Sequence, residues 1–205
     1  MRRACPAPAG LVLAALGLMA AGPADPQRFI APSGQLFTAA ADAPYPVVLW
    51  VAAADADGDG RLTRAEFLAD ALRYFARLDS DGDGELDGFE VAAYEQEVLR
   101  PLRAPMPGAV PTGGERTPDR PPTGSPPRGA PLTAGHYGLI DAPQPVKAAD
   151  SDVNARVTED EYRKLILARF AALDGAGQGF LTLATLPETP AQKAARLTVE
   201  GSVRR

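Results

Sequence analysis

Two twelve-residue segments, 55-DADGDGRLTRAE-66 (loop 1) and 79-DSDGDGELDGFE-90 (loop 2), decide the expected fold of this chain. Both follow the pattern D-x-[DN]-x-[DN]-G-x5-E, and they begin 24 residues apart. A hard divalent cation takes about six to eight oxygen ligands, which a short loop supplies only by wrapping around the ion. The glycine at position 6 permits the sharp turn that this wrapping needs. The two segments therefore predict two cation-binding loops.

The candidate ligands follow from the loop positions. Positions 1, 3, 5, 9 and 12 offer side chains, and position 7 offers its backbone carbonyl. The metal-binding candidates of loop 1 are Asp55, Asp57, Asp59, Arg61 (through its carbonyl) and Glu66. Those of loop 2 are Asp79, Asp81, Asp83, Glu85 (through its carbonyl), Asp87 and Glu90.

A weaker copy of the pattern occurs at 150-DSDVNARVTEDE-161 (loop 3), with candidate ligands Asp150, Asp152, Asn154, Arg156 (through its carbonyl) and Glu161. Ala155 stands at position 6, where a left-handed conformation costs a residue with a Cβ atom about 1–2 kcal/mol. Loop 3 also offers three acidic ligands, against four in loop 1 and five in loop 2 when Asp87 is included. We therefore predict that loop 3 binds an ion more weakly than loops 1 and 2.

The fourth copy, 174-DGAGQGFLTLAT-185 (loop 4), keeps the glycines but not the ligands. Ala176 has no side-chain oxygen, and Thr185 cannot close the site with a bidentate carboxylate. We expect loop 4 to be free of metal and to support its neighbour structurally.

These four segments resemble the calmodulin-like EF-hand superfamily, and in particular exported bacterial EF-hand proteins whose hands are joined by Pro/Gly-rich linkers. The resemblance covers about residues 45–100 and 137–187. It implies an all-α fold of two EF-hand pairs and Ca²⁺ as the bound ion. It also implies an antiparallel bridge at position 8 within each pair, which would join Leu62 to Leu86 and Val157 to Leu181.

Composition divides the chain into four parts. Arg2, Arg3 and an apolar run over 9–21 indicate a signal peptide at 1–24, and hence a periplasmic or secreted protein with no membrane span in the mature chain. Residues 25–100 would form the N-terminal EF-hand pair. Residues 101–131 contain ten prolines and five glycines, which predicts a disordered linker. Residues 132–205 would form the C-terminal pair, with its second hand degenerate.

Helical patterns flank the loops. Thr63 with Glu66, and Thr158 with Glu161, form T-x-x-E capping boxes that begin the outgoing helices. We expect the incoming helix of the first hand over 46–54, with Trp50 in the core. Pro143 and Pro145 predict an irregular or short-helical segment before loop 3. A last helix is expected over about 189–199.

Composition also limits the function. Twenty-six acidic against 21 basic residues argue against a nucleic-acid partner, and one cysteine and one histidine exclude a disulfide framework and a Cys/His zinc site. The chain is not expected to be an enzyme, because its carboxylates are committed to the loops and other catalytic groups are scarce.

The favoured function is a calcium-binding protein that acts as a buffer or a metal-stabilised interaction module. The alternatives are a calcium sensor that regulates an unidentified protein partner, a structural or adhesion module, and a lanthanide-binding periplasmic protein. The sensor is less favoured because Met106, in the expected linker, is the only methionine outside the signal peptide.

Overall fold

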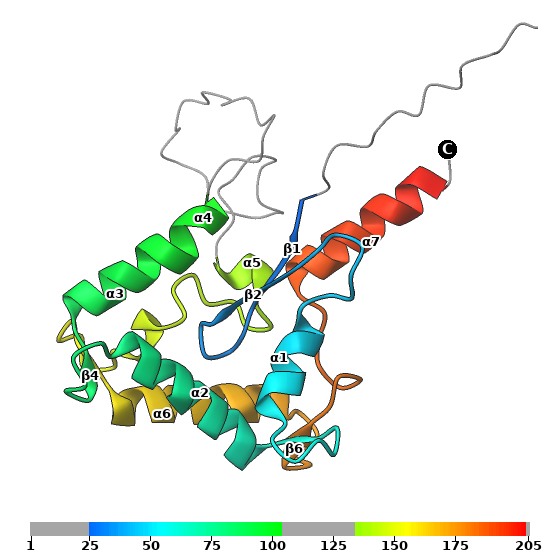
Figure 1. The fold of residues 1–205 in the computed structure, drawn as a ribbon. Coiled ribbons are helices and arrows are strands. Elements are labelled where there is room, and N and C mark those ends of the chain that lie inside the picture. The colour runs from blue at the N-terminus through cyan, green and yellow to red at the C-terminus, as the bar shows by residue number, and fades with distance from the viewer. Residues whose placement is uncertain (1–24, 104–133, 204–205) are drawn as a thin grey trace, which may run out of the picture.

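The computed structural model describes residues 25–103 and 134–203 (Figure 1). The expected signal peptide and residues 104–131 of the expected linker lie outside the described residues. Within the described part, none of the helices combines the length and the apolar character that crossing a membrane requires.

The described chain is mainly helical, in agreement with the all-α expectation. Its helices are α1 (Val47–Ala54), α2 (Arg64–Leu78), α3 (Gly88–Tyr94), α4 (Arg100–Arg103), α5 (Ala134–Tyr137), α6 (Glu159–Leu173) and α7 (Pro190–Val203). A π-helical turn (Glu95–Leu99) joins α3 to α4, and a 3₁₀-helix (Lys147–Ala149) precedes loop 3. The strands are β1 (Gln27–Ile30), β2 (Leu36–Ala39), β3 (Leu62–Thr63), β4 (Glu85–Leu86), β5 (Val157–Thr158) and β6 (Phe180–Leu181).

Capping boxes fix where the helices after the loops begin. The boxes predicted at Thr63 and Thr158 are confirmed, and each threonine accepts the backbone N–H of the glutamate three residues later. A third box joins Asp87 to Glu90 at the start of α3. This third box was not predicted, although Asp caps helices as well as Thr does.

The expected bridge partners are wrong. β3 of loop 1 pairs with β6 of loop 4, so that Leu62 lies opposite Leu181. β4 of loop 2 pairs with β5 of loop 3, so that Leu86 lies opposite Val157. Each bridge therefore joins the N-terminal half of the chain to the C-terminal half, whereas the resemblance implied bridges between successive loops.

Helix length explains this pairing. A single fifteen-residue helix, α2, separates loop 1 from loop 2, and α6 of the same length separates loop 3 from loop 4. At 1.5 Å per residue each helix is about 22 Å long, so the loops at its two ends cannot touch. Antiparallel packing of α2 on α6 then places loop 1 beside loop 4 and loop 2 beside loop 3.

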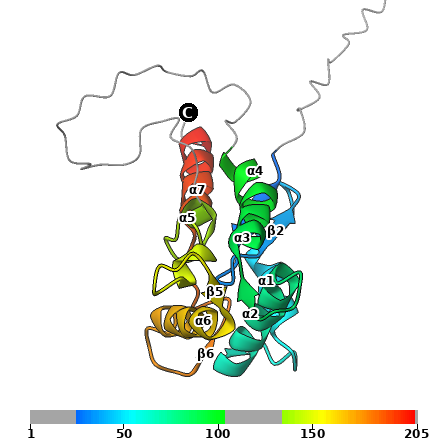
Figure 2. The ribbon, with the colours of Figure 1, turned by 90° about the vertical axis from the view of Figure 1, so that its left-hand side faces the viewer.

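Aromatic contacts confirm that α2 and α6 run antiparallel. At one end the ring of Phe67 lies 5.3 Å from that of Phe170, and at the other end the ring of Phe75 lies 5.2 Å from that of Tyr162. In Figure 2 the two halves of the chain lie side by side with α2 next to α6. The buried hydrophobic residues form one core cluster with members from both halves. The domain boundaries drawn from the sequence stay a prediction, but the two halves share this core.

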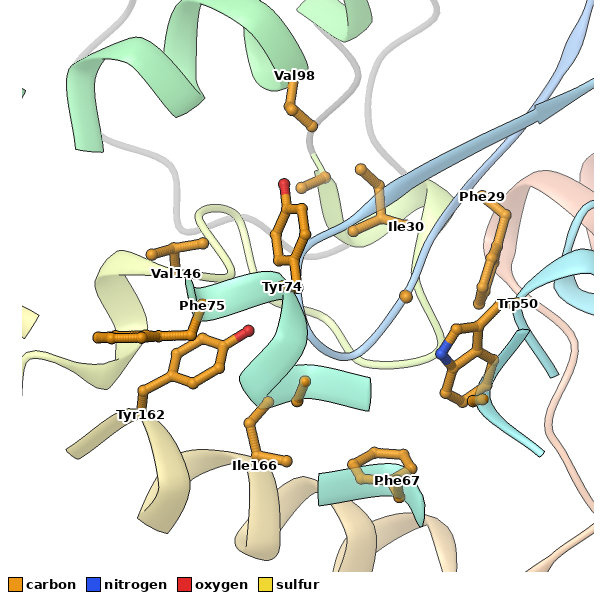
Figure 3. Close-up of a cluster of buried hydrophobic side chains, with 14 of the residues drawn as sticks. Phe29, Ile30, Trp50, Phe67, Tyr74, Phe75, Val98, Val146, Tyr162 and Ile166 are labelled. Atoms are coloured by element: carbon orange, nitrogen blue, oxygen red, sulfur yellow. The ribbon is translucent and has the colours of Figure 1, made fainter. Parts of the chain in front are cut away.

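An antiparallel hairpin of β1 and β2, which the sequence did not predict, contributes to this core mainly through β1. Phe29 and Ile30 on β1 are fully or almost fully buried. The ring of Phe29 lies 5.7 Å from that of Trp50, which is buried as expected. Figure 3 shows Ile30 among the buried side chains of Phe29, Tyr74 and Val98. A turn sequence, Pro-Ser-Gly, between two short apolar strands was the signal that could have revealed the hairpin.

The helices expected next to the loops are found with small shifts in their bounds. α1 begins one residue after Pro46 and ends at Ala54, and the segment before loop 3 is short-helical. Helix α4 extends three residues into the expected linker, and Leu102 is buried there.

Candidate metal-binding sites

Three clusters of carboxylates occupy equivalent places in loops 1, 2 and 3. In each loop the residues at positions 1, 3 and 12 bring one oxygen apiece within 4.8 Å of the others. The three clusters are Asp55, Asp57 and Glu66; Asp79, Asp81 and Glu90; and Asp150, Asp152 and Glu161. Oxygen-only donors at this spacing fit a hard divalent cation such as calcium.

The aspartate at position 1 holds each loop in its curved shape. In loop 1, Asp55 Oδ1 accepts the N–H of Gly58 at 2.8 Å, and Oδ2 accepts that of Gly60 at 2.9 Å. In loop 2, Asp79 accepts the equivalent N–H groups, those of Gly82 and Gly84. In loop 3, Asp150 accepts the N–H groups of Asn154 at position 5 and Ala155 at position 6. This aspartate therefore organises the loop as well as offering oxygen to an ion.

The glutamate at position 12 ties the end of each loop to its beginning. Glu66 Oε1 accepts the N–H of Ala56 at 2.9 Å, and Oε2 accepts the N–H of Thr63 at 2.9 Å. Glu161 makes the equivalent bonds to Ser151 and Thr158. These bonds favour the ionised form. The bond from the Thr158 backbone is the largest cause lowering the pKa of Glu161 to about 2, and the bonds from Thr63 lower the pKa of Glu66.

Loop 2 concentrates negative charge. The backbone N–H of Asp83 lowers the pKa of Asp81, but desolvation and the charges of Asp83, Glu90 and Asp79 together raise it above its ordinary value. A cation among these oxygens would relieve this repulsion, so the donor set of loop 2 fits a divalent ion on electrostatic grounds.

The other predicted ligands are placed as follows. The side-chain oxygens of Asp59, Asp83 and Asn154 at position 5 accept the N–H of position 7 at 2.7–2.8 Å, and the two aspartates lie outside the carboxylate clusters. Asp87 Oδ1 accepts the N–H groups of Phe89 and Glu90 as the cap of α3.

Side chains at position 7 connect the paired loops. Arg156 Nη1 donates to Glu85 Oε2 at 2.9 Å, which joins loop 3 to loop 2. The Arg61 guanidinium lies 4.8 Å from the centre of the Phe180 ring, which joins loop 1 to loop 4. The sequence predicted that the backbone carbonyls of Arg61 and Arg156 bind an ion. It did not predict that their side chains contact the paired loop.

Backbone strain distinguishes loop 3 from the others. Positions 4 and 6 have positive φ in every loop, and glycine occupies both positions in loops 1, 2 and 4. In loop 3 these positions hold Val153, with φ 61°, and Ala155, with φ 66°. Positive φ is unfavourable for any residue with a Cβ atom and most unfavourable for a β-branched one. Strain was predicted from the sequence at Ala155 but not at Val153, because the ligand pattern leaves position 4 free.

Loop 4 keeps the shape of the other loops through its backbone bonds. Asp174 accepts the N–H groups of Gln178 and Gly179 at 2.8 and 2.7 Å. Thr185 Oγ1 accepts the N–H of Thr182 at 2.9 Å, where the other loops use glutamate. Loop 4 is therefore folded to pair with loop 1, and its lack of metal stays a prediction.

The fold places helices on both sides of a twelve-residue acidic loop and pairs the loops through short bridges. This arrangement is the helix–loop–helix class, and its carboxylate groups could hold a cation. The family model described as EF hand matches residues 52–69, which contain the end of α1, all of loop 1 and the start of α2. This match covers the first hand, and residues 52–69 are thus similar to an EF hand. No curated protein matches the chain at a significant level.

Proposed function

We propose that this is an exported calcium-binding protein that acts as a buffer or as a metal-stabilised interaction module. The observation that carries the proposal is the gathering of carboxylates from positions 1, 3 and 12 in three loops of one molecule. The EF-hand match over 52–69 supports calcium as the ion.

The residues that would hold the ions are the ligands predicted for loops 1, 2 and 3. Bound calcium would neutralise the acidic clusters and hold the two ends of each loop together. If the free ion is present at 100 times its dissociation constant, each site adds about 2.7 kcal/mol to the free energy of unfolding.

The emission of Trp50 offers a direct test at loop 1. Trp50 packs with its ring 5.9 Å from that of Phe67, the residue that follows the ligand Glu66. We expect calcium to change the Trp50 emission, and calorimetry to detect ion binding at three sites, the weakest in loop 3. Glu66→Gln should abolish the emission change, because it removes one of the three clustered charges.

Glu97→Gln is the matched control, since Glu97 lies exposed on the π-helical turn away from the carboxylate clusters. This variant should bind calcium like the unmodified protein. A protein that binds no calcium at millimolar concentration, by calorimetry and by emission, would rule the proposal out.

One observation favours a second candidate, lanthanide binding. The crowding of charge that raises the pKa of Asp81 would be relieved further by a trivalent ion than by calcium. Competition between calcium and a lanthanide at loop 2 decides between them. The ratio of lanthanide affinity to calcium affinity is measured at loop 2 and at loop 1. A larger ratio at loop 2 than at loop 1 would favour the second candidate.

The export part of the proposal rests on the sequence of residues 1–24. The expected mature chain begins at Asp25, two residues before β1. Sequencing the N-terminus of protein recovered from the periplasm or the medium tests both the export and the cleavage position.

A further inference from the structure

The turn between β1 and β2 is buried between α3, which follows loop 2, and α6, which follows loop 3. Residues 29–34 are all buried, including the polar Ser33, which is 2% exposed. Gly34 N–H donates to Ala31 O at 2.8 Å, and Ala31 N–H donates to Gln35 O at 2.9 Å, so the turn closes on itself. A buried turn is unusual because loops normally leave their backbone polar groups at the surface.

Three side chains from α3 and α6 satisfy three successive carbonyls of this turn. Tyr94 Oη on α3 donates to Gly34 O at 2.9 Å, and Tyr162 Oη on α6 donates to Ser33 O at 2.6 Å. The guanidinium of Arg169, also on α6, donates to Pro32 O and, at 2.9 Å, to Pro145 O. Arg169 is only 5% exposed and Tyr162 is fully buried. Without the turn the two tyrosines would lose these acceptors and Arg169 would keep only Pro145 O, so their burial would no longer be fully compensated.

The shape of the site selects glycine at position 34. Gly34 has φ +94°, a conformation that residues with a side chain rarely adopt. A Cβ atom built there would lie 3.0 Å from Tyr94 Oη and 3.1 Å from a methyl carbon of Val146. The backbone conformation and the close contacts thus each disfavour a side chain at this position.

We infer that the inner face of α3 and α6, defined by Tyr94, Tyr162 and Arg169, is a docking surface for a glycine-containing backbone turn, and that residues 31–35 of this chain are its built-in occupant. A calcium sensor would use such a space between its hands to receive a partner. Here the chain fills the space itself, so calcium binding does not open it. The inference rests on the proposed function only in taking calcium as the bound ion. It deepens that function, because it assigns the protein to buffering or scaffolding and not to sensing.

The groove next to the turn agrees with this assignment. It has a volume of about 700 Å³, lies between α2 and α3, and ends against Gln35 and Leu36 of the hairpin. Its walls mix the apolar side chains of Tyr74 and Phe89 with charged ones.

The test uses the full chain with Gly34→Leu, which should expel the turn from the docking surface. Thr38→Leu is the control, because it adds the same side chain at an exposed position of the same hairpin. Binding of a hydrophobic dye is measured in calcium and in chelator, together with hydrogen exchange of the backbone amides of residues 27–39. Calorimetry on the same samples measures calcium binding separately.

We expect dye fluorescence of the unmodified protein and of Thr38→Leu to be the same in calcium and in chelator. Gly34→Leu should bind several times more dye in both conditions. A synthetic peptide of residues 27–39 in excess should reverse this increase, whereas the same peptide carrying Gly34→Leu should not. Reversal by the native peptide shows that the surface recognises the turn itself.

The double variant Tyr94→Phe with Tyr162→Phe covers the case in which Gly34→Leu fails to fold. It removes two hydrogen bonds without adding volume, and should speed amide exchange in residues 31–35 at least about tenfold while the helical content stays unchanged. Unchanged exchange in this variant would overturn the inference, as would dye binding by the unmodified protein that rises several-fold with calcium. A protein that binds no calcium contradicts the proposed function alone, since the exchange and dye measurements in chelator still decide the inference.

Discussion

Leu62 of loop 1 lies directly opposite Leu181 of loop 4, 119 positions further along the chain, and both side chains are buried. The corresponding partner of Leu86 in loop 2 is Val157 in loop 3. Both bridges therefore connect the two halves of the molecule. An ion bound in any of loops 1 to 3 would lie at the junction between the halves, and we expect it to order the paired loop as well as its own.

A double-mutant cycle tests this pairing. In saturating calcium, Leu62→Ala and Leu181→Ala should each lower the free energy of unfolding by about 2–5 kcal/mol, because each leaves a cavity in the core. Their effects should couple by at least about 0.5 kcal/mol, since the two residues are in contact. Leu62→Ala with Leu86→Ala is the control pair. These two residues lie on either side of α2, so their effects are expected to be additive. If only the control pair showed coupling, the result would support bridges between successive loops.

Relief of strain in loop 3 is expected from Val153→Gly. Val153 is 86% exposed and has φ 61°, so glycine loses little contact and gains a favourable conformation. The free energy of unfolding should rise by about 1 kcal/mol, as measured by denaturant titration in chelator. Val153→Ala, which keeps the Cβ atom but removes the branch, should give a smaller gain.

The same substitution should strengthen calcium binding at loop 3 if the loaded loop tightens around the ion. Calorimetry on Val153→Gly and on Ala155→Gly measures this effect, with the unmodified loops 1 and 2 as internal references. A free energy of unfolding that falls in both variants would show that the positive φ values are not a source of strain.

Cleavage between the halves provides a third test. A protease site inserted in residues 104–133 and then cut should leave two fragments that elute together in calcium, because they share a core and two bridges. Chelation should weaken the complex, and size-exclusion chromatography measures both states. Fragments that elute apart in calcium would instead support two independent lobes.

The buried Asp70 predicts a pH dependence of stability. Its carboxylate accepts Trp50 Nε1–H at 3.0 Å and Arg73 Nη2–H at 2.8 Å. Burial raises the pKa of Asp70 above its ordinary value of 3.8, although Trp50 and Arg73 partly oppose this effect. The folded state therefore binds this proton more tightly than the unfolded state does, and ionisation of Asp70 costs stability above its folded pKa.

The free energy of unfolding of the unmodified protein should accordingly rise relative to that of Asp70→Asn as the pH falls from neutral through the folded pKa toward 3.8. Denaturant titrations in chelator measure this difference, and the carboxylates common to both proteins cancel. Asp42→Asn, at an exposed position, serves as the control and should show no such trend. A difference that stays constant with pH would mean that the pKa of Asp70 is the same in both states.

Much of the site could be predicted from the sequence because its determinants are local. Position 1 and position 12 act on N–H groups at most ten residues away, so a twelve-residue pattern contains the whole arrangement. The capping boxes at Thr63 and Thr158 are local in the same sense. Val153 was missed because a ligand pattern registers oxygen donors and not backbone angles.

The pairing of the loops was mispredicted for a different reason. The family resemblance implied bridges between successive hands, but the interval of twelve residues between Glu66 and Asp79 holds only one helix. That interval was available in the sequence, and with the rise of an α-helix it excludes contact between loops 1 and 2. The bridges were predicted from the family resemblance, without taking into account the length of the helix between the loops.

The sequence alone determined which segments curve into acidic loops, where the helices after them begin, and which loop lacks ligands, because hydrogen bonds and charges within a few residues fix these features. Only the tertiary structure decided that loop 1 meets loop 4, that loop 2 meets loop 3, and that the turn at residues 31–35 lies between α3 and α6. These relationships depend on which apolar faces pack together and on donors more than sixty residues apart from each other, such as Tyr94 and Tyr162, and no short stretch of sequence encodes them.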